Sequence, residues 1–266
     1  MELVDHTKPL IEDKEFVADV IEEDFSQKSF NRVFALKKVF TDVSFKQSEI
    51  SNCYFRNCRF IRCDFTGANI ARSNFRGAQY EECKFHYSTW EHTILDEEFL
   101  DNCLPSEDSL ARDLARSLRT NFSQIGNYQA VNKAASIEVA MTGLHFFNAA
   151  FSKQSYYRSK YKGWRRILHV LRYTKWKALD LLWGNGESLL RIIASGIFAV
   201  LVCSLVLAWR EPIFPWSDVF GLVATAFWGV ETTPPLPGHF LAMLTAIRFV
   251  LFGLFMAILV KRLSRR

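Results

Sequence analysis

The amino-acid sequence predicts a mixed membrane protein, in which a repeat domain and an α-helical connector precede two transmembrane helices. Two observations predict this class. Large apolar residues recur at every fifth position between residues 40 and 95, a period that belongs neither to a helix nor to a strand. Farther along, residues 188–260 contain long apolar runs, whereas residues 1–187 are polar or amphipathic. The mean hydropathy of +0.00 therefore averages over two unlike parts.

The five-residue period is unbroken over twelve positions. In order they are Phe40, Phe45, Ile50, Phe55, Phe60, Phe65, Ile70, Phe75, Tyr80, Phe85, Trp90 and Leu95. The residues two places earlier, from residue 53 on, are uniformly small: Cys53, Cys58, Cys63, Ala68, Ser73, Ala78, Cys83, Ser88 and Thr93. We infer a repeat architecture in which one side chain in five points toward a shared axis.

These two columns resemble the pentapeptide-repeat family, in which a small residue, a polar residue and a Leu or Phe precede two variable positions. The best match within the chain is CDFTGANIARSNF, and the resemblance covers roughly residues 25–100. The family implies a right-handed quadrilateral β-helix with one pentapeptide per side, so that residues 20 apart stack on adjacent coils. The expected ladders are Phe45, Phe65 and Phe85 on one side and Phe40, Phe60 and Tyr80 on another.

The segment CYFRNCRFIRC places three cysteines at a spacing of five. The N-terminus has no basic segment followed by an apolar core, so we expect no signal peptide and a cytoplasmic location, where thiols stay reduced. Zinc would need sulfurs that converge as a tetrahedron, which different sides of a filled prism do not offer. We therefore expect Cys53, Cys58 and Cys63 to pack in the core, with Cys83 and Cys103 in the same register. We expect neither a metal nor another cofactor.

The composition of the chain argues against two classes of function. Some proteins of the pentapeptide-repeat family are acidic mimics of DNA, but between residues 40 and 95 seven basic side chains accompany six acidic ones. The six histidines are scattered, and no serine or cysteine has the partners of a catalytic triad. We therefore expect neither a DNA mimic nor an enzyme.

The connector begins with a helix and continues with a basic, aromatic stretch. Ser106 is expected to cap a first helix, and residues 127–151 form its amphipathic partner, which together predict a helical hairpin around Ile125-Gly126. Residues 153–187 hold nine lysines and arginines among seven aromatic residues. Such a mixture fits nucleic acid or an anionic membrane surface. Because the stretch leads into a transmembrane helix, we expect a membrane-surface helix and no nucleic acid, although a solvated face on a packed helix remains open.

Two apolar stretches are long enough to cross a bilayer, residues 192–209 and residues 240–260. Both are flanked by basic residues on the sides that lead to the chain termini, so the positive-inside rule places both termini in the cytoplasm and the protein in the inner (plasma) membrane. Between them, Ser217 is expected to cap an apolar helix over residues 218–227, which is too short to cross. A span, a short helix, a polar loop and a second span predict a re-entrant element.

This C-terminal half resembles the two-helix pore module of the potassium-channel superfamily, particularly bacterial proteins that carry pentapeptide repeats ahead of such a module. The resemblance covers about residues 110–266 and is carried by GNGESLLRII, FGLVATAFWGVETTPP and AILVKRLSRR. It implies a homo-oligomer, expected to be a tetramer, with a pore helix and an ion-selectivity filter. The chain would then divide into an acidic N-terminal cap (1–24), a pentapeptide-repeat β-helix (25–104), a cytoplasmic helical connector (105–187) and a two-helix pore domain (188–266).

The segment at the filter position departs from the family pattern. By the resemblance, Gly229 holds the first filter glycine, while Val230 replaces the aromatic residue, Glu231 the second glycine and Thr232 the acid, with Thr233 next. Glutamate does not favour the backbone conformations that aim carbonyl groups at a dehydrated ion, so ordinary K⁺ selectivity is not expected. Four copies of Glu231 would instead form a carboxylate ring that attracts cations, divalent ones included. The alternative is that Glu231 faces its own short helix or pairs with Arg210.

Two residues of the second span complete the candidate site. Arg248 is an arginine inside a membrane segment, which normally faces a cavity or a partner. It is expected to neutralise Glu231, to put positive charge on a cavity wall and favour anions, or to tie subunits together. Gly253 is a possible hinge, although small residues also serve helix packing.

The sequence thus favours an oligomeric ion channel, most simply a cation channel with a Glu231 ring, whose cytoplasmic repeat domain serves assembly or gating. Its partners would be permeant ions, the lipid bilayer with its anionic headgroups, further copies of the chain and an unidentified cytoplasmic ligand or protein. Two alternatives remain open, a nonconducting membrane-anchored scaffold and an anion-permeable pore governed by Arg248.

Overall fold

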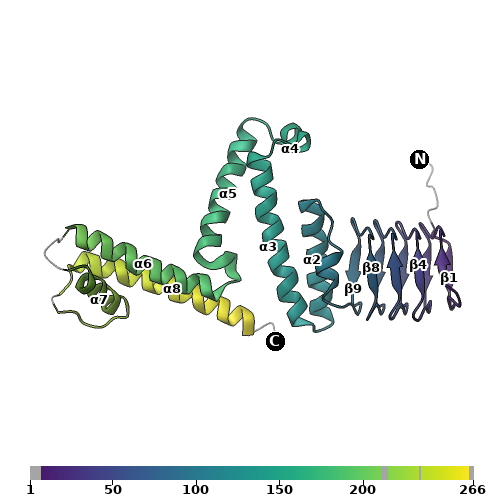
Figure 1. Cartoon of the computed structure of the whole chain (residues 1–266), viewed down its shortest axis with the longest axis horizontal. Coiled ribbons are helices and arrows are strands. Elements are labelled where there is room, and N and C mark those ends of the chain that lie inside the picture. Colours follow the sequence, from purple (N-terminus) through teal and green to yellow (C-terminus); the bar gives the residue numbers. More distant parts are fainter. Residues whose placement is uncertain (1–6, 211–214, 234, 264–266) are drawn as a thin grey trace. The chain divides into compact units, whose positions relative to one another are not determined.

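The computed structural model describes residues 7–210, 215–233 and 235–263 (Figure 1). The chain separates into two compact units, Met1–Lys162 and Gly163–Arg266, and each is described by itself. The first residues of the predicted acidic cap and the last three residues of the basic C-terminal run lie outside the described residues.

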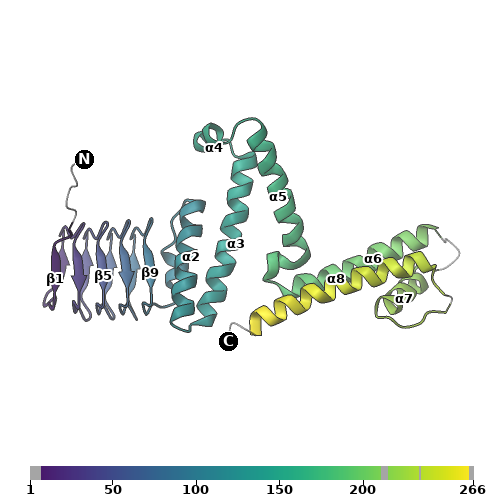
Figure 2. The ribbon, with the colours of Figure 1, turned by 180° about the vertical axis from the view of Figure 1, so that it is seen from behind.

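The first unit starts with a β-solenoid of short parallel strands. One sheet holds β1 (Leu10–Glu12), β3 (Ser29–Asn31), β5 (Glu49–Ser51), β7 (Asn69–Ala71) and β9 (Thr89–Glu91). The second sheet holds β2 (Val20–Ile21), β4 (Val39–Thr41), β6 (Arg59–Ile61) and β8 (Gln79–Glu81). Figures 1 and 2 show the coils stacked in chain order. Single bridges such as Ser44↔Asp64 and Tyr54↔Asn74 join adjacent coils between the strands, so the predicted solenoid is confirmed.

The large apolar residues fill the inside of the solenoid as stacked rings. Phe65 lies between Phe45 and Phe85, with ring centroids 4.9 and 5.1 Å away. Phe60 lies between Phe40 and Tyr80 at 5.0 and 5.4 Å. Both predicted ladders are therefore confirmed, and their offset stacking adds to the hydrophobic stabilisation of the buried rings.

The cysteines of the repeat pack as small core residues. Cys53, Cys58 and Cys63 are buried, and none of the six cysteines forms a disulfide. Burial raises the pKa of the Cys53 thiol to about 11, which keeps it protonated and unreactive near neutral pH. Cys103 departs from the predicted register, because the chain has already left the last coil through the short helix α1 (Phe99–Asn102), which Cys103 ends.

The solenoid begins before the predicted boundary at residue 25. Strands β1 and β2 form a first coil within the segment expected to be a cap. In that coil Leu10 pairs with Ser29 of the next coil. These two residues are separated by one residue fewer than Ile50 and Ile70, which pair in the same way between later coils. The inward-pointing residues therefore include one step of four residues, between Phe16 and Val20. Because of this step, the first coil does not follow the period of five.

A helical hairpin closes the C-terminal end of the solenoid, and the prediction of this hairpin is confirmed. Helix α2 (Asp108–Gln124) lies beside β9, and α3 (Tyr128–Phe151) packs on α2. The buried Asn121 side chain accepts from the Thr93 N–H at 2.7 Å and donates to the Thr93 carbonyl at 2.8 Å. The Ser117 hydroxyl and the Gln124 side chain accept from the Trp90 and His92 N–H groups. These bonds replace a further strand at the open edge.

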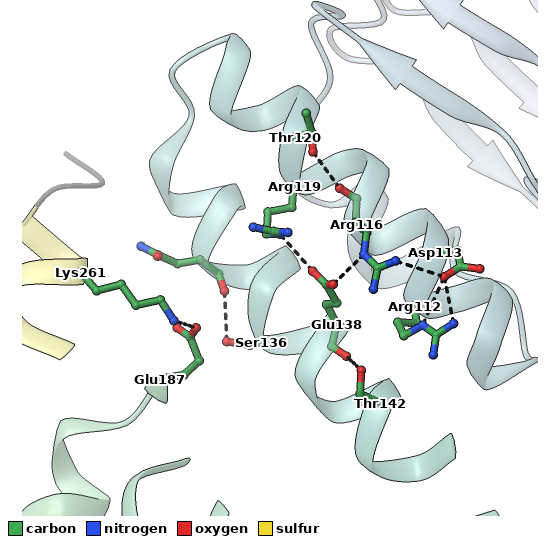
Figure 3. Close-up of polar contacts among 11 residues, drawn as sticks. Arg112, Asp113, Arg116, Arg119, Thr120, Ser136, Glu138, Thr142, Glu187 and Lys261 are labelled. Atoms are coloured by element: carbon green, nitrogen blue, oxygen red, sulfur yellow. Dashed lines mark hydrogen bonds and ion pairs between the residues drawn. The ribbon is translucent and has the colours of Figure 1, made fainter. Parts of the chain in front are cut away.

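The start of α2 lacks the polar cap that the sequence predicts, whereas ion pairs join the two helices at the middle of the hairpin. The predicted cap at Ser106 is wrong, because α2 begins one residue later than a cap there would allow and its N-cap residue, Glu107, makes no side-chain capping bond. Glu138 of α3 accepts from the Nε atoms of Arg116 and Arg119 of α2, at 2.8 and 3.0 Å (Figure 3). This paired contact fixes the register of the two helices.

The second unit forms helices and loops and contains no strand within its described residues. It contains α5 (Trp164–Trp183), the turn η1 (Gly184–Gly186), α6 (Leu189–Arg210), α7 (Trp216–Phe227) and α8 (Gly238–Leu263), while α4 (Ser155–Lys160) ends the first unit. Helices α6 and α8 are long and apolar enough to cross a membrane. The short helix α7 starts after Pro215, its N-cap residue, so the backbone of Ser217 lies in the first turn of the helix and not at the cap position predicted for it.

Replacing Phe65 by Ala should destabilise the solenoid by about 3–5 kcal/mol, because the ring is fully buried between two others and leaves a cavity. The free energy of unfolding would be measured for the full chain in detergent by urea titration with circular dichroism. Tyr87→Ala is the matched control, since Tyr87 is 73% exposed and should change stability by about 0.5 kcal/mol or less. Equal losses in the two variants would contradict the ladder as the source of stability.

Asn121→Ala should cost about 2–4 kcal/mol, because the backbone N–H and carbonyl of Thr93 lose their partners in a buried position. Hydrogen exchange of β9 should accelerate more than that of β5, which is far from the cap. The exposed Ser123→Ala change on the same helix serves as the control and should leave both rates unchanged. Uniform acceleration across all coils would argue against a local cap.

Candidate functional site

The three apolar helices of the second unit enclose a groove of about 720 Å³. Val219, Val223 and Ala226 of α7 are buried against α6 and α8 and hold the short helix in place. The groove is lined almost entirely by apolar side chains, and its aromatic residues are Phe220, Phe227, Trp228, Phe249, Phe252 and Phe255. Arg248 is the only charged residue among the described residues that line it.

The C-terminal end of α7 lies partway along the two long helices. A Cβ atom placed on Gly196 of α6 would lie 4.0 Å from Phe227 Cζ and 3.9 Å from Leu251 Cδ1 of α8. At 1.5 Å per residue, Gly196 is about 21 Å from the end of α6 at Arg210, and Arg248 is about 15 Å from the start of α8. The end of α7, from Phe227 to Gly229, therefore lies well inside the length of the apolar helices.

Gly229 ends α7 in a left-handed conformation. Its φ is +84°, its N–H donates to the Ala226 carbonyl at 2.9 Å, and the Val230 N–H donates to the Thr225 carbonyl at 3.1 Å. These two bonds form a Schellman motif, which satisfies carbonyl groups at the end of a helix and favours glycine at this position. The residue that the resemblance placed as a filter glycine thus has a helix-capping role in the single chain.

Arg248 lies against this helix end. Its Nη1 donates to the Phe227 carbonyl at 3.5 Å, its guanidinium lies 5.3 Å from the centroid of the Phe249 ring, and a Cβ atom on Gly229 would collide with it. A cation at the C-terminal end of a helix interacts favourably with the partial negative charge there. No ion pair joins Arg248 to Glu231, or Glu231 to Arg210, among the described residues. Arg248 therefore does not neutralise Glu231 within one chain.

The other residues of the candidate site lie on the surface of the single chain. Val230, Glu231 and Thr233 are exposed, and Thr232 is half-buried. Helix α8 runs unbroken through Gly253, where an added Cβ atom would meet no neighbour within 4 Å. The hinge at Gly253 therefore stays a prediction, as do the pore-lining roles of residues 229–233.

The structure also gathers a polar cluster that the sequence did not indicate. In the first unit the Tyr157 hydroxyl donates to the buried Asp108 carboxylate at 2.6 Å, and His145 Nδ1 lies 3.5 Å from the same carboxylate. The Tyr161 hydroxyl lies 3.4 Å from His145 Nε2. Burial is the main cause that lowers the pKa of His145. The cluster joins the start of α2, the last third of α3 and the segment around α4, and no local sequence signal links residues so far apart.

Comparisons with known proteins bear on the solenoid. The family model described as pentapeptide repeats matches residues 39–79 with eight copies. One solved structure that resembles the chain is a pentapeptide repeat protein from the thylakoid lumen of Arabidopsis thaliana, with 13% sequence identity, 32% of this chain and 72% of that chain covered, and a TM-score of 0.15. No curated protein matches the chain.

Gly229→Ala should destabilise the second unit by about 1–2 kcal/mol, because alanine disfavours the left-handed conformation, and by more where the new Cβ displaces Arg248. In an Arg248→Ala background the second contribution should vanish, so the two changes should be coupled. The free energy of unfolding of the four species in detergent gives this coupling. Gly253→Ala is the matched control and should be neutral or stabilising, because its site is helical and open. Strict additivity would contradict the contact between Arg248 and the helix end.

Proposed function

We propose that this pentapeptide-repeat protein with a β-solenoid is an integral membrane protein whose chains assemble around a cation-conducting pore. The observation that carries the proposal is the depth of the α7 end, since Phe227 and Gly229 lie beside the middle of two membrane-length helices. Non-helical backbone at such a depth is stable only when it is buried in protein or lines water. Residues 229–233 are largely exposed in one chain, so further copies around an axis would supply that environment.

The surfaces of α6 and α8 support insertion in the inner membrane with both termini in the cytoplasm. Only 28% of the α6 span and 11% of the α8 span are buried inside the unit. Their remaining apolar surface needs lipid or other chains as its neighbour. Basic residues flank both helices on the sides of the chain termini, which favours a cytoplasmic location for those ends.

The charges of the site favour cations as the permeant ions. Glu231 is exposed, lies two residues after Gly229 and has no ion pair among the described residues. Arg248 lies at the end of α7, where the helix carbonyl groups compensate part of its charge. In a tetramer, the symmetry expected from the resemblance to potassium channels, four Glu231 side chains would form a carboxylate ring. Such a ring attracts cations, including divalent ones, and does not require the arrangement of backbone carbonyl groups found in a K⁺ filter.

Two alternatives have specific support. An anion-permeable pore is favoured by Arg248, the one charged residue among the described residues that line the groove. A nonconducting membrane-anchored scaffold is favoured by the solenoid, because stacked coils present a regular, rigid surface to a cytoplasmic partner. Both alternatives keep the same architecture and differ from the cation channel only in whether the oligomer conducts ions and in the charge of those ions. One ion-flux experiment therefore separates the three.

The native chain in planar bilayers should carry cation-selective current, and Glu231→Gln should lower its preference for divalent cations by removing the carboxylate ring. The measurement is the reversal potential in asymmetric calcium and potassium salts. Asp218→Asn removes the same charge at the opposite end of α7 and should change the reversal potential less. Anion current that Arg248→Gln abolishes would replace this proposal by the anion pore. An assembled oligomer that stays silent across voltage, pH and Ca²⁺ would favour the scaffold.

A further inference from the structure

Helix α5 carries a strip of apolar side chains that the described residues leave uncovered. In this strip, Trp164, Leu168, Leu171 and Leu182 share one face of the helix, with Ile167 and Leu181 along one edge of that face, and Lys175 interrupts it between Leu171 and Leu182. Trp164 and Leu181 are each 74% exposed. A helix with such a face needs either a protein partner or a membrane interface to bury it.

The charges beside the apolar strip are almost all positive. Arg165, Arg172, Lys175 and Lys177 are exposed on α5. The only acid on the helix, Asp180, is engaged by Arg191 of α6 and lies 3.4 Å from Lys177. Basic side chains beside an exposed apolar face complement the anionic headgroups above the hydrocarbon of a bilayer. They would complement a neutral protein surface less well.

The C-terminal end of α5 is joined to the membrane-length helices. Arg191 Nη1 donates to the Asp180 carbonyl at 2.7 Å, and the Ser195 hydroxyl donates to the Leu182 carbonyl at 2.8 Å. Lys261, near the end of α8, donates to the Gly186 carbonyl at 3.2 Å and pairs with Glu187 (Figure 3). Figures 1 and 2 show α5 running across the long axis of α6 and α8 from this junction. If α6 and α8 cross a bilayer, α5 thus lies along its surface.

We propose that α5 docks on the anionic leaflet of the membrane, with its apolar strip among the acyl chains and its cations on the phosphate-bearing headgroups. This inference rests on the membrane insertion in the proposed function. It does not depend on conduction.

The test uses the full chain in nanodiscs of phosphatidylcholine, either alone or with roughly a third phosphatidylglycerol. Hydrogen exchange of the α5 amides, followed by mass spectrometry, should be slower in the anionic nanodiscs, by about fivefold for each cation engaged. High salt should remove the difference, because it screens exposed charges. The variant R165Q/R172Q/K175Q should also lose the difference.

The matched control is R56Q/R76Q/K84Q, which removes the same charge from exposed positions of the solenoid and should keep the native response. The α6 and α8 amides report insertion in the same experiment and should be protected in both nanodiscs. Equal α5 exchange in both lipids with α6 and α8 protected would overturn the docking proposal alone and indicate burial against protein. Rapid exchange of α6 and α8 in both lipids would contradict insertion, and the docking proposal would fall with it.

Discussion

The solenoid depends on one constraint, the stacking of each coil on the next at about 4.8 Å. At that distance a side chain that points inward touches its counterpart one coil away, so every inward column must hold residues of similar size. Phe45, Phe65 and Phe85 meet this demand with parallel rings, and the small column does so with buried cysteine, serine and alanine. The constraint also leaves unpaired backbone groups at the last coil. These groups need hydrogen-bond partners, and the helical hairpin supplies them. Asn121 makes the hydrogen bonds that another strand would have made.

In the second unit, the end of α7 has a comparable role. A helix that stops beside the middle of two apolar helices leaves its last carbonyl groups without helical partners, and in the proposed membrane setting these groups would need partners within the protein. The Schellman motif at Gly229 and the Arg248 guanidinium supply them. The same arrangement separates the two charges of the candidate site, since Arg248 faces the helix end while Glu231 is exposed. In the proposed oligomer the two charges would then act on different parts of the permeation path.

Much of the solenoid could be predicted, because its five-residue period is visible in a continuous stretch of the sequence. The ladders and the buried cysteines can be predicted from the spacing of five residues. The first coil cannot, because a single four-residue step breaks the period at Val20. The resemblance singles out Gly229 as a filter glycine. Its capping hydrogen bonds could not be predicted, because they depend on the residue at which α7 ends. The contact of Arg248 with Phe227 joins two helices, and the cluster around Asp108 joins three segments. Such contacts arise from packing, which no local pattern encodes.

The turn between α5 and α6 links the proposed membrane-surface helix to the proposed pore. Gly184, Asn185 and Gly186 all have positive φ, a conformation that glycine adopts freely and that asparagine tolerates better than most residues, so the chain turns sharply over three residues. Lys261 binds this turn from the end of α8, and Arg191 binds the last residues of α5 from the start of α6. A displacement of α5 therefore acts on both long helices at the same end. If α5 docks on an anionic leaflet as proposed, the lipid charge and the position of the α8 end would be coupled through one short segment, whose contacts include ion pairs and carbonyl hydrogen bonds.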